Sequence, residues 1–533
     1  MTALDSHVLV VGAGFAGMSL LARLRDRGFT VAGVERGEDV GGTWYWSRYP
    51  GLHCDIESMH YSYAWDPDLQ DEWEWTNRYA TGAEIHEYAR HVAERYDLRP
   101  LIRFGTAVTA LEFDEESDTW TARFSDGSAH VARWVVLAIG TLSTPKPIDL
   151  PGAADFNGRS LTTTDWPSEE PDLSGDRVAL IGTGSSGIQT ATAIADRVGH
   201  LSVCQRTASY TMPAHNRRLS PEEVAEWKAD YARIREEERN SSSGIGHERT
   251  GKLTFEVDVE ARRELYEKAY RAGTPFAFFA IFEDGLVDEA ANATIHEFWA
   301  DKIRERVDDP ETAEKLVPSG YPIGTRRCCI DNGYYEIFNS DHVDLVDIKA
   351  NPIERVEPAG LRLSDGSLLE VDTIVHATGY DAFTGTLARI DIRGEAGRTL
   401  AEDWADGPET NLGLQIAGYP NLFLVTGPQS PSVLSNMMVS IEQHVEMILA
   451  ALDTAREAGA GRIGTSRAAQ EAWMAHCREV ESMSLFRKAD SWYSGTNVPG
   501  KPRIVLPYVG GVGVFREVCT DVMAADWKGF EFA

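Results

Sequence analysis

The sequence predicts an α/β fold that contains two β–α–β units and a helical insertion. Two short apolar runs, at residues 7–11 and 177–181, each lead into a glycine-rich turn and then into a helix-like stretch, which is the order of a β–α–β unit. From about 255 to 316 the sequence becomes helical and charged. The 533 residues exceed one ordinary core, so we expect two or three domains.

The first unit lies at the N-terminus, where HVLVV precedes the turn GAGFAG. Gly12, Gly14 and Gly17 match G-x-G-x-x-G, whose glycines give a tight turn, close approach to a pyrophosphate and close helix packing. Glu35 ends the next predicted strand, 29–34. A carboxylate there binds the adenosine ribose hydroxyls and excludes a 2′-phosphate. The first site therefore fits FAD or NAD.

The second unit has its glycine turn within IGTGSSGIQ, and its next strand ends at Cys204-Gln205-Arg206-Thr207. Arg206 stands where an acid is expected, and an arginine there attracts a 2′-phosphate. Two sites of opposite ribose preference indicate a flavoprotein in which NADPH reduces FAD. The residues expected around NADPH in this unit are Thr183, Gly184, Ser185, Ser186, Gly187, Gln189, Arg206 and Thr207.

Capping signatures and apolar runs predict the remaining elements. Thr81 and Glu84 open a predicted helix as a capping box, and Ser220 and Glu223 open another. The Pro-rich stretch 144–152 predicts a domain boundary. Further strands are predicted at 131–140, 343–347 and 371–379, and a further helix around 436–452.

Charge and cysteine content exclude several partners. The chain has 51 basic and 83 acidic residues, a net charge of −32, so its surface repels nucleic acid and anionic membranes. No apolar run approaches the ~20 residues of a membrane span, and we find no signal peptide. The six cysteines form no CxxC pair, which indicates a reducing cytosol and no zinc site. We expect a cytoplasmic monomer or weak oligomer without a metal.

Longer motifs extend over nearly the whole chain. They are GGTWYWSRYPGLHCDIES at 41–58, GYPIGTRR at 320–327, HATGYDAFTG at 376–385, GPQSPSVLSN at 427–436 and SWYSGTNVPGKPR at 491–503. Together they resemble Baeyer–Villiger monooxygenases of the phenylacetone, cyclohexanone and steroid monooxygenase group. The resemblance implies two Rossmann-like dinucleotide-binding domains, each discontinuous, and a helical insertion. We expect FAD at 1–145 and 380–533, NADP at 152–215 and 321–379, and the insertion at 216–320.

The resemblance also implies a reaction, in which NADPH and O2 convert a ketone into an ester or lactone through a C4a-peroxyflavin. It makes Arg327 the active-site arginine and Asp55 the carboxylate that pairs with it. A guanidinium offers several donors and keeps its proton, so it can stabilise an oxygen anion. Without the resemblance, such a pair would more often be a structural salt bridge.

Other family positions carry over residue by residue. Arg326 stands where the family has a lysine for the NADP phosphate, and Trp492 matches a residue that contacts bound NADP. The loop of Ser432, Val433 and Leu434 lines the substrate pocket in relatives. The residues expected around FAD are Gly12, Gly14, Phe15, Gly17, Glu35, Gly42, Thr43, Trp44, Asp55, Tyr61, Val108 and Met437.

One family signature is incomplete in this chain. The signature reads F-x-G-x-x-x-H-x-x-x-W-P and corresponds here to residues 156–167, but Thr162 replaces the histidine. Threonine keeps a hydroxyl and loses the ring and its titration. In the family this segment couples NADPH binding to flavin chemistry. We therefore expect Thr162 to alter this coupling rather than the type of reaction.

Three other functions are compatible with two dinucleotide sites. A heteroatom oxygenase, which oxidises nitrogen or sulfur, shares both sites, but Arg327 with Asp55 argues against it. A disulfide reductase needs a redox cysteine pair beside the flavin, and we expect the neighbouring Cys328 and Cys329 to be buried and inert. A non-catalytic flavoprotein would bind FAD without substrate-dependent oxygen consumption.

Overall fold

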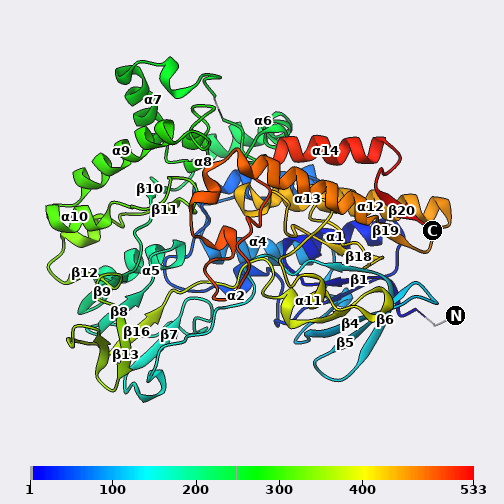
Figure 1. The fold of residues 1–533 in the computed structure, drawn as a ribbon, viewed down its shortest axis with the longest axis horizontal. Helices are drawn as coiled ribbons and strands as arrows, with labels where there is room; N and C mark the ends of the chain where they lie inside the picture. The colour runs from blue at the N-terminus through cyan, green and yellow to red at the C-terminus, as the bar shows by residue number, and fades with distance from the viewer. Residues whose placement is uncertain (1–3, 248) are drawn as a thin grey trace.

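The computed structural model describes residues 4–247 and 249–533, and its helices pack around two main sheets (Figure 1). The strands of the larger sheet are β1 (Ser6–Val11), β2 (Val31–Val34), β3 (Ile102–Arg103), β4 (Val108–Asp114), β5 (Thr119–Phe124), β6 (Ala129–Leu137), β17 (Asp391–Arg393) and β18 (Leu422–Leu424). Their order is β17-β4-β5-β6-β1-β2-β3, with β18 beside β6. The strands around β1 are parallel, whereas β5 pairs antiparallel with β4 and β6.

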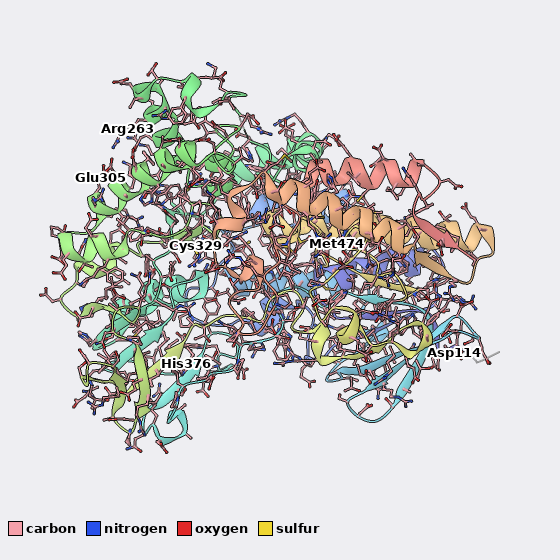
Figure 2. All side chains as sticks on the ribbon, in the orientation of Figure 1. Asp114, Arg263, Glu305, Cys329, His376 and Met474 are labelled. Atoms are coloured by element: carbon pink, nitrogen blue, oxygen red, sulfur yellow. The ribbon has the colours of Figure 1, made fainter. Side chains whose placement is uncertain are left out.

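The smaller sheet is parallel throughout. Its strands are β7 (Arg159–Thr162), β8 (Arg177–Ile181), β9 (His200–Gln205), β12 (Val343–Asp347) and β16 (Thr373–His376), in the order β12-β9-β8-β16-β7. A parallel sheet is covered on both faces, and accordingly the last four residues of β8 are all buried. His376 in this sheet and Asp114 in the larger one lie on opposite sides of the molecule (Figure 2).

The helical insertion follows β9 and occupies one corner of the molecule (Figure 1, upper left). Its helices are α6 (Pro221–Asn240), α7 (Val259–Ala272), α8 (Pro275–Phe279), α9 (Glu289–Arg306) and α10 (Pro310–Leu316). The two sheets and this insertion confirm the predicted α/β fold class. The exact domain boundaries stay a prediction.

The other elements complete the layers around the sheets. The helices are α1 (Phe15–Asp26), α2 (Thr43–Trp46), α3 (Pro67–Glu72), α4 (Gly82–Arg95), α5 (Ser185–Ile194), α11 (Leu400–Asp403), α12 (Met437–Ala458), α13 (Arg467–Ser482) and α14 (Val512–Ala524). The minor strands are β10 (Thr211–Pro213), β11 (Cys329–Asp331), β13 (Ile353–Glu357), β14 (Gly360–Leu363), β15 (Leu368–Glu370), β19 (Ile463–Thr465) and β20 (Phe530–Phe532).

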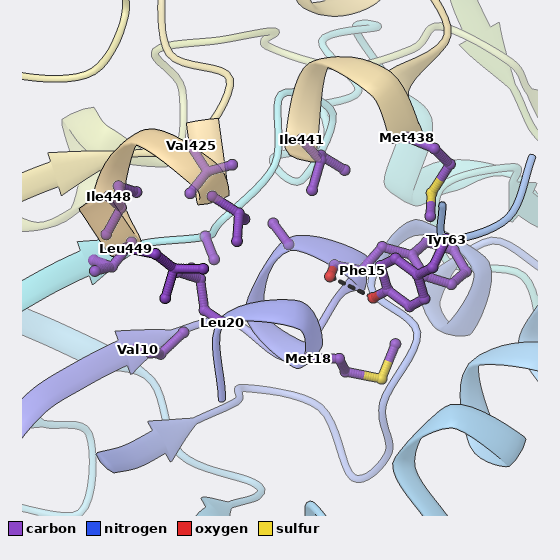
Figure 3. Packing of buried hydrophobic residues seen from close by; sticks show 14 of the residues in the cluster. Val10, Phe15, Met18, Leu20, Tyr63, Val425, Met438, Ile441, Ile448 and Leu449 are labelled. Carbon is purple, nitrogen blue, oxygen red and sulfur yellow. Dashed lines mark hydrogen bonds between the residues drawn. The ribbon is translucent and has the colours of Figure 1, made fainter. Parts of the chain in front are cut away.

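Helix α1 is buried between the larger sheet and α12 (Figure 3). Met18 and Leu20 of α1 are fully buried and belong to one core with Ile448 of α12. The Tyr63 hydroxyl donates to the Phe15 carbonyl at 2.5 Å, at the first turn of α1. This packing fixes the start of α1, and with it the first glycine turn.

Of the two predicted capping boxes, one is complete. Ser220 accepts the Glu223 N–H at 3.2 Å, and the Glu223 carboxylate accepts the Ser220 N–H at 2.9 Å. Thr81 caps α4 by accepting the Glu84 N–H. The reciprocal contact predicted there is wrong, because the Glu84 carboxylate accepts the Thr76 N–H at 2.6 Å instead.

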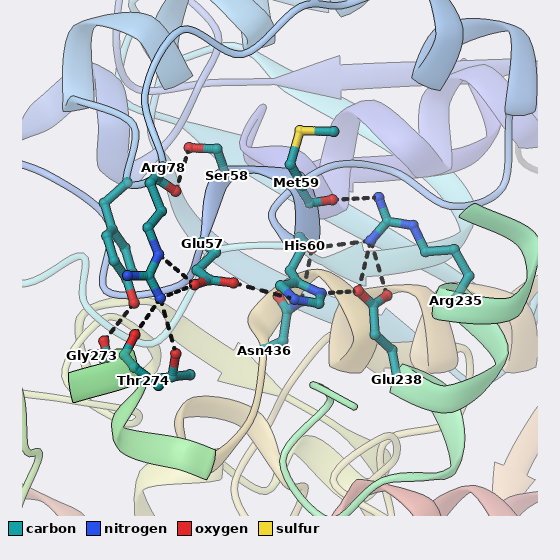
Figure 4. A network of polar contacts seen from close by, with 12 residues as sticks. Glu57, Ser58, Met59, His60, Arg78, Arg235, Glu238, Gly273, Thr274 and Asn436 are labelled. Atoms are coloured by element: carbon teal, nitrogen blue, oxygen red, sulfur yellow. Dashed lines mark hydrogen bonds and ion pairs between the residues drawn. The ribbon is translucent and has the colours of Figure 1, made fainter. Parts of the chain in front are cut away.

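A buried ion network joins the insertion to residues 57–62 and to the start of α12 (Figure 4). Glu238 of α6 lies 2.9 Å from Arg235 Nη1 and 2.5 Å from His60 Nδ1. Arg235 also donates to the Met59 carbonyl at 3.1 Å. Asn436, the cap of α12, donates to the His60 carbonyl at 2.8 Å. Helix α6 is therefore anchored beside both the 57–62 segment and the start of α12.

In the part of the chain that the structure describes, every helix is too short or too polar to cross a membrane. The same residues contain no group of three or more His, Cys, Asp or Glu that could hold a metal ion.

Candidate active site

The first glycine turn lies between β1 and α1. A Cβ on Gly17 would lie 1.9 Å from the Gly12 carbonyl oxygen, so only glycine lets the helix pack this close to the turn. The backbone N–H groups at the start of α1 make this a site for an anion such as a pyrophosphate.

Glu35 follows β2 directly and is 7% exposed. Its carboxylate accepts the Ala13 N–H at 2.8 Å and the Gly37 N–H at 2.7 Å. These contacts fix the carboxylate beside the glycine turn. A carboxylate has about four acceptor positions, so capacity remains for two ribose hydroxyls.

A cavity of about 570 Å³ extends from this turn to the second one, because residues of both line it. Its walls combine a helix N-terminus, the Glu35 carboxylate and aromatic rings, a donor set that fits FAD. Trp44 Nε1–H donates to the Tyr61 hydroxyl at 3.2 Å, which holds both rings in place. The residues expected around FAD that line this cavity are Gly12, Gly14, Phe15, Glu35, Gly42, Thr43, Trp44, Asp55, Tyr61, Val108 and Met437. Gly17 does not line the cavity and instead packs against the Gly12 carbonyl.

The second glycine turn lies between β8 and α5 and repeats the first. A Cβ on Gly187 would lie 2.0 Å from the Gly182 oxygen, whereas one on Gly184 would meet nothing within 4 Å. Open space at Gly184 lets a ligand approach the backbone there. The Thr183 hydroxyl donates to the Thr207 carbonyl at 2.8 Å, so the turn is tied to the segment that carries Arg206.

Ser185, Ser186, Gln189 and Trp492 line the large cavity, although they were expected at the NADPH site. Gln189 connects the two domains, because Tyr49 donates to its Oε1 at 2.9 Å and its Nε2 donates to the His53 carbonyl at 3.1 Å. The NADPH side and the FAD side of the site are thus continuous.

Arg327 and Asp55 are in direct contact, although they are far apart in the sequence. Arg327 donates from Nε to Asp55 at 2.7 Å and from Nη2 at 2.5 Å, and from Nη1 to the Val433 carbonyl at 2.8 Å. Burial lowers the pKa of Arg327, but the charge and hydrogen bond of Asp55, together with the nearby Tyr493 and Cys329, raise the pKa above its usual value. Three of the five N–H groups are used in these contacts, and the others lie beside Tyr493 and the cavities.

A second cavity, of about 220 Å³, shares Asp55, Arg327 and Val433 with the first. Arg327 therefore stands where the two cavities meet. The second cavity is lined mainly by apolar and aromatic side chains, among them Phe276, Phe279, Phe282, Leu286, Leu434 and Phe486. Val433 and Leu434 of the expected substrate loop line it, whereas Ser432 is fully buried and lines neither cavity.

Two residues of this junction were missed by sequence reasoning. Phe276 of the insertion places its ring 5.0 Å from the Arg327 guanidinium. Tyr493 lines the small cavity, and burial, opposed by Arg327, raises the pKa of its phenol to about 12. Tyr493 follows Trp492 in a quoted motif, which was a usable signal. Nothing in the local sequence marked Phe276.

Cys328 and Cys329 lie next to Arg327, near the middle of the molecule, where Figure 2 labels Cys329. Both are free and buried. Burial raises the pKa of both thiols, that of Cys329 to about 12. Both thiols are buried, as predicted, and their raised pKa favours the protonated form. The inertness of the pair stays a prediction.

Thr162 ends β7, and its hydroxyl lies 2.9 Å from that of Thr164, which lines the large cavity. In the sheet Thr162 pairs with His376 of β16. A histidine is therefore present on the neighbouring strand, where its Nε2 lies 3.1 Å from the Ser160 hydroxyl.

Known proteins resemble this chain over its whole length. The family described as Pyridine nucleotide-disulphide oxidoreductase matches residues 6–235. A Baeyer-Villiger monooxygenase of Pseudooceanicola batsensis is 38% identical and covers 97% of this chain and 94% of its own. Phenazine N-monooxygenase PhzNO1 of Lysobacter antibioticus is also 38% identical and covers 98% of this chain and 96% of its own.

Solved structures agree with these relatives. An oxidized steroid monooxygenase bound to NADP superimposes with a TM-score of 0.95 at 44% identity, and the match covers 99% of each chain. The likeness includes both dinucleotide domains and the insertion. The chain belongs to the family of FAD-dependent Baeyer–Villiger monooxygenases.

Proposed function

We propose that the protein uses NADPH and O2 to convert a compact, apolar ketone into an ester or lactone. The observation that carries this function is Arg327, held by Asp55 at the junction of a dinucleotide cavity and a small apolar cavity. FAD, when bound, supplies the redox chemistry by accepting hydride from NADPH and activating O2.

The chain's own residues would hold the cofactors as follows. The N-terminus of α1 would face the FAD pyrophosphate and Glu35 its adenosine ribose. The second glycine turn would hold the NADPH pyrophosphate, and Arg206 and Arg326 its 2′-phosphate. Trp492 lines the large cavity, where it would contact the same cofactor.

Arg327 would stabilise the negative charge that develops on the ketone oxygen. Its guanidinium stays protonated at every working pH, and the bidentate contact with Asp55 fixes its plane. Burial keeps water away from the charge, which strengthens this interaction. The Tyr493 hydroxyl also stays protonated, because its pKa is raised to about 12, so it can donate a second hydrogen bond in the same cavity.

The size of the second cavity limits the substrate. Its 220 Å³ lie below the roughly 300–1,000 Å³ of pockets for drug-sized ligands. Phe279 and Leu286 form part of its wall and favour an apolar body beside the carbonyl. A ketone with a single ring or a short chain fits this space better than a polycyclic one.

Oxidation of nitrogen or sulfur is the second candidate. The relative named Phenazine N-monooxygenase is 38% identical to this chain, as is the Baeyer-Villiger monooxygenase of Pseudooceanicola batsensis. The Arg327–Asp55 contact favours the ketone reaction. A charged donor at a developing oxygen anion serves attack on a carbonyl, and an amine or a sulfide offers no such oxygen.

The test is NADPH and O2 consumption by the FAD-loaded protein with a panel of ketones, amines and sulfides, with products identified by mass. We expect ketone-stimulated consumption and a product that carries one oxygen atom from ¹⁸O2. Oxides formed from amines while every ketone yields only hydrogen peroxide would replace this proposal by the second candidate.

The protein is further expected to act in the cytoplasm as a monomer or weak oligomer, without nucleic acid. The net charge of −32 and six free cysteines support this expectation. Light scattering after size exclusion would measure the oligomeric state, and a tetramer would contradict it.

A further inference from the structure

We infer that Lys146, on the connector between the two domains, is a third cation for the 2′-phosphate of NADP, so that the bound cofactor holds this connector in place. The inference rests on the proposed NADPH site at Arg206 and Arg326. It adds a specificity residue that none of the motifs contains.

The backbone places Lys146 at the carboxyl edge of the smaller sheet. Its N–H donates to the Gly379 carbonyl at 3.1 Å, and Pro145 forms a β-bridge with Tyr380. Gly379 and Tyr380 follow β16, just as Arg206 follows β9. Because carboxyl ends of parallel strands meet at one edge, the connector reaches the edge where a dinucleotide binds.

The acids near this edge are already paired with other residues. Asp381 forms an ion pair with Lys501, and Asp490 forms one with Arg503 at 2.5 Å. Within the described ranges 4–247 and 249–533, no carboxylate contacts the side chain of Lys146 or Arg206.

Arg326 lines the small cavity, and it lies close enough to Arg206 for the two charges to interact. Its guanidinium lies over the Tyr321 ring at 4.4 Å, and its buried Nε has no hydrogen-bond partner among the described residues. An unpaired buried donor of this kind costs stability unless a ligand satisfies it.

Arg206 acts on both of the other cations. Burial, followed by the charge of Arg206, lowers the pKa of Lys146, and Asp381 opposes this shift. Burial lowers the pKa of Arg326, and Arg206 adds to this effect while Tyr321 and Asp490 oppose it. A phosphate that carries up to two negative charges would relieve this repulsion.

The contact would have a structural consequence. Lys146 belongs to the segment 144–152, which joins the ranges expected for the FAD and NADP domains. A phosphate held by Lys146 and Arg206 together would add a side-chain contact to the backbone contacts that tie the connector to the smaller sheet. NAD lacks this phosphate and would not add the contact.

Calorimetric titration of the FAD-loaded protein with NADP⁺, NAD⁺ and 2′,5′-ADP tests the inference without turnover. We expect Lys146→Met to raise the Kd for NADP⁺ and 2′,5′-ADP by at least about tenfold, the loss of one charged hydrogen bond, and to leave that for NAD⁺ unchanged. Lys146→Arg should restore binding. Lys528→Met, which removes an exposed lysine of the C-terminal segment, is the matched control, and the flavin absorbance reports an intact fold.

If Lys146→Met raises the Kd for NADP⁺ and for NAD⁺ equally, Lys146 contacts the pyrophosphate or supports the fold, and the inference is overturned. An unchanged Kd for NADP⁺ would also overturn it. The variant Arg206→Met shows whether only the role of Lys146 is wrong or the proposed NADPH site as a whole. If Arg206→Met weakens NADP⁺ and Lys146→Met does not, only the role of Lys146 is wrong. If neither weakens it, the site itself is wrong, whereas ketone turnover by the unaltered protein still tests the reaction.

Discussion

Asp55 holds Arg327 through two nitrogen atoms, at 2.7 and 2.5 Å, and this geometry depends on the planar fork of arginine. Lysine would offer one rotating ammonium group in its place. The third contact, from Nη1 to the Val433 carbonyl at 2.8 Å, also links the guanidinium to the substrate loop. The position and orientation of the charge are therefore set before any ligand arrives, as electrostatic catalysis requires.

We expect Arg327→Lys to reduce ketone oxygenation by about 100-fold or more, because it removes preorganised donors from a developing oxygen anion. FAD should remain bound, since the glycine turn and Glu35 are untouched. Product formation and hydrogen peroxide release, measured separately, should show NADPH consumption diverted to peroxide. Arg271→Ala, at an arginine 75% exposed on α7, is the control. Ester formation by the Lys variant near the unaltered rate would remove Arg327 from catalysis.

At this scale the sequence predicted the chemistry only with the help of the family resemblance. Arg327 and Asp55 lie in separate motifs, and no local pattern says that they touch. Glu35 was predictable from spacing alone, because a β–α–β unit fixes where the strand after the turn ends. Phe276 was not predictable, since its approach to Arg327 depends on how the insertion folds back on the site.

In the second glycine turn, one glycine is needed for folding and another for ligand binding. A Cβ on Gly187 would lie 2.0 Å from the Gly182 oxygen, whereas the space beside Gly184 is open. We expect Gly184→Ala to fold and bind FAD but to lose NADP⁺ affinity by about tenfold or more, because its methyl group occupies the ligand's approach. Flavin absorbance and NADP⁺ titration measure both properties. Gly187→Ala is the contrasting variant and should reduce the yield of folded protein. Unchanged NADP⁺ binding by Gly184→Ala would contradict this account of the turn.

Helix α6 offers a second test, because it carries both buried and exposed ion pairs. Arg235 and Glu238 are 6% and 1% exposed in their side chains, whereas Arg233 is 58% exposed. Arg235→Met leaves Glu238 without its main counter-charge, which costs about 3–5 kcal/mol at a buried site.

Hydrogen exchange of the α6 amides should therefore accelerate by about 100-fold or more in Arg235→Met. The control Arg233→Ala removes two exposed ion pairs, with Asp230 and Glu237, which contribute little because solvent screens them, and should change the exchange by a few-fold. Equal effects of the two variants would show that the buried network does not anchor the insertion.

Element prediction succeeded where local chemistry decides. Ser220 and Glu223 form the predicted capping box, and the strand predicted at 343–347 is β12. It was incomplete where tertiary contacts compete, as at Glu84, whose carboxylate binds the Thr76 N–H. The strand predicted at 371–379 ends at His376, because the chain then turns through Gly379 at a φ of 79°.

At the scale of the whole molecule, the site forms where the two β–α–β units and the insertion meet. The large cavity takes residues from both glycine turns, and the small cavity takes Phe276 and Phe279 from α8. Periodicity and motifs predicted the units, but the volume between them depends on how they pack. The volume of the small cavity, on which the proposed ketone size depends, therefore became visible only in the three-dimensional structure.

The pH dependence of stability tests the packing of α12 against the segment that contains Ala64. Burial raises the pKa of Glu442 from 4.5 to about 7, so between these values the folded state binds more protons than the unfolded state, and stability falls as pH rises. Glu442→Gln keeps an acceptor for the Ala64 N–H, which Glu442 now binds at 2.6 Å. Relative to the unaltered protein, this variant should gain roughly 3 kcal/mol between pH 4.5 and pH 8. Thermal unfolding midpoints at both pH values measure the gain. Glu446→Gln, one turn along α12 and 30% exposed, is the control, and equal midpoint shifts at both pH values would show that folding does not raise the pKa of Glu442.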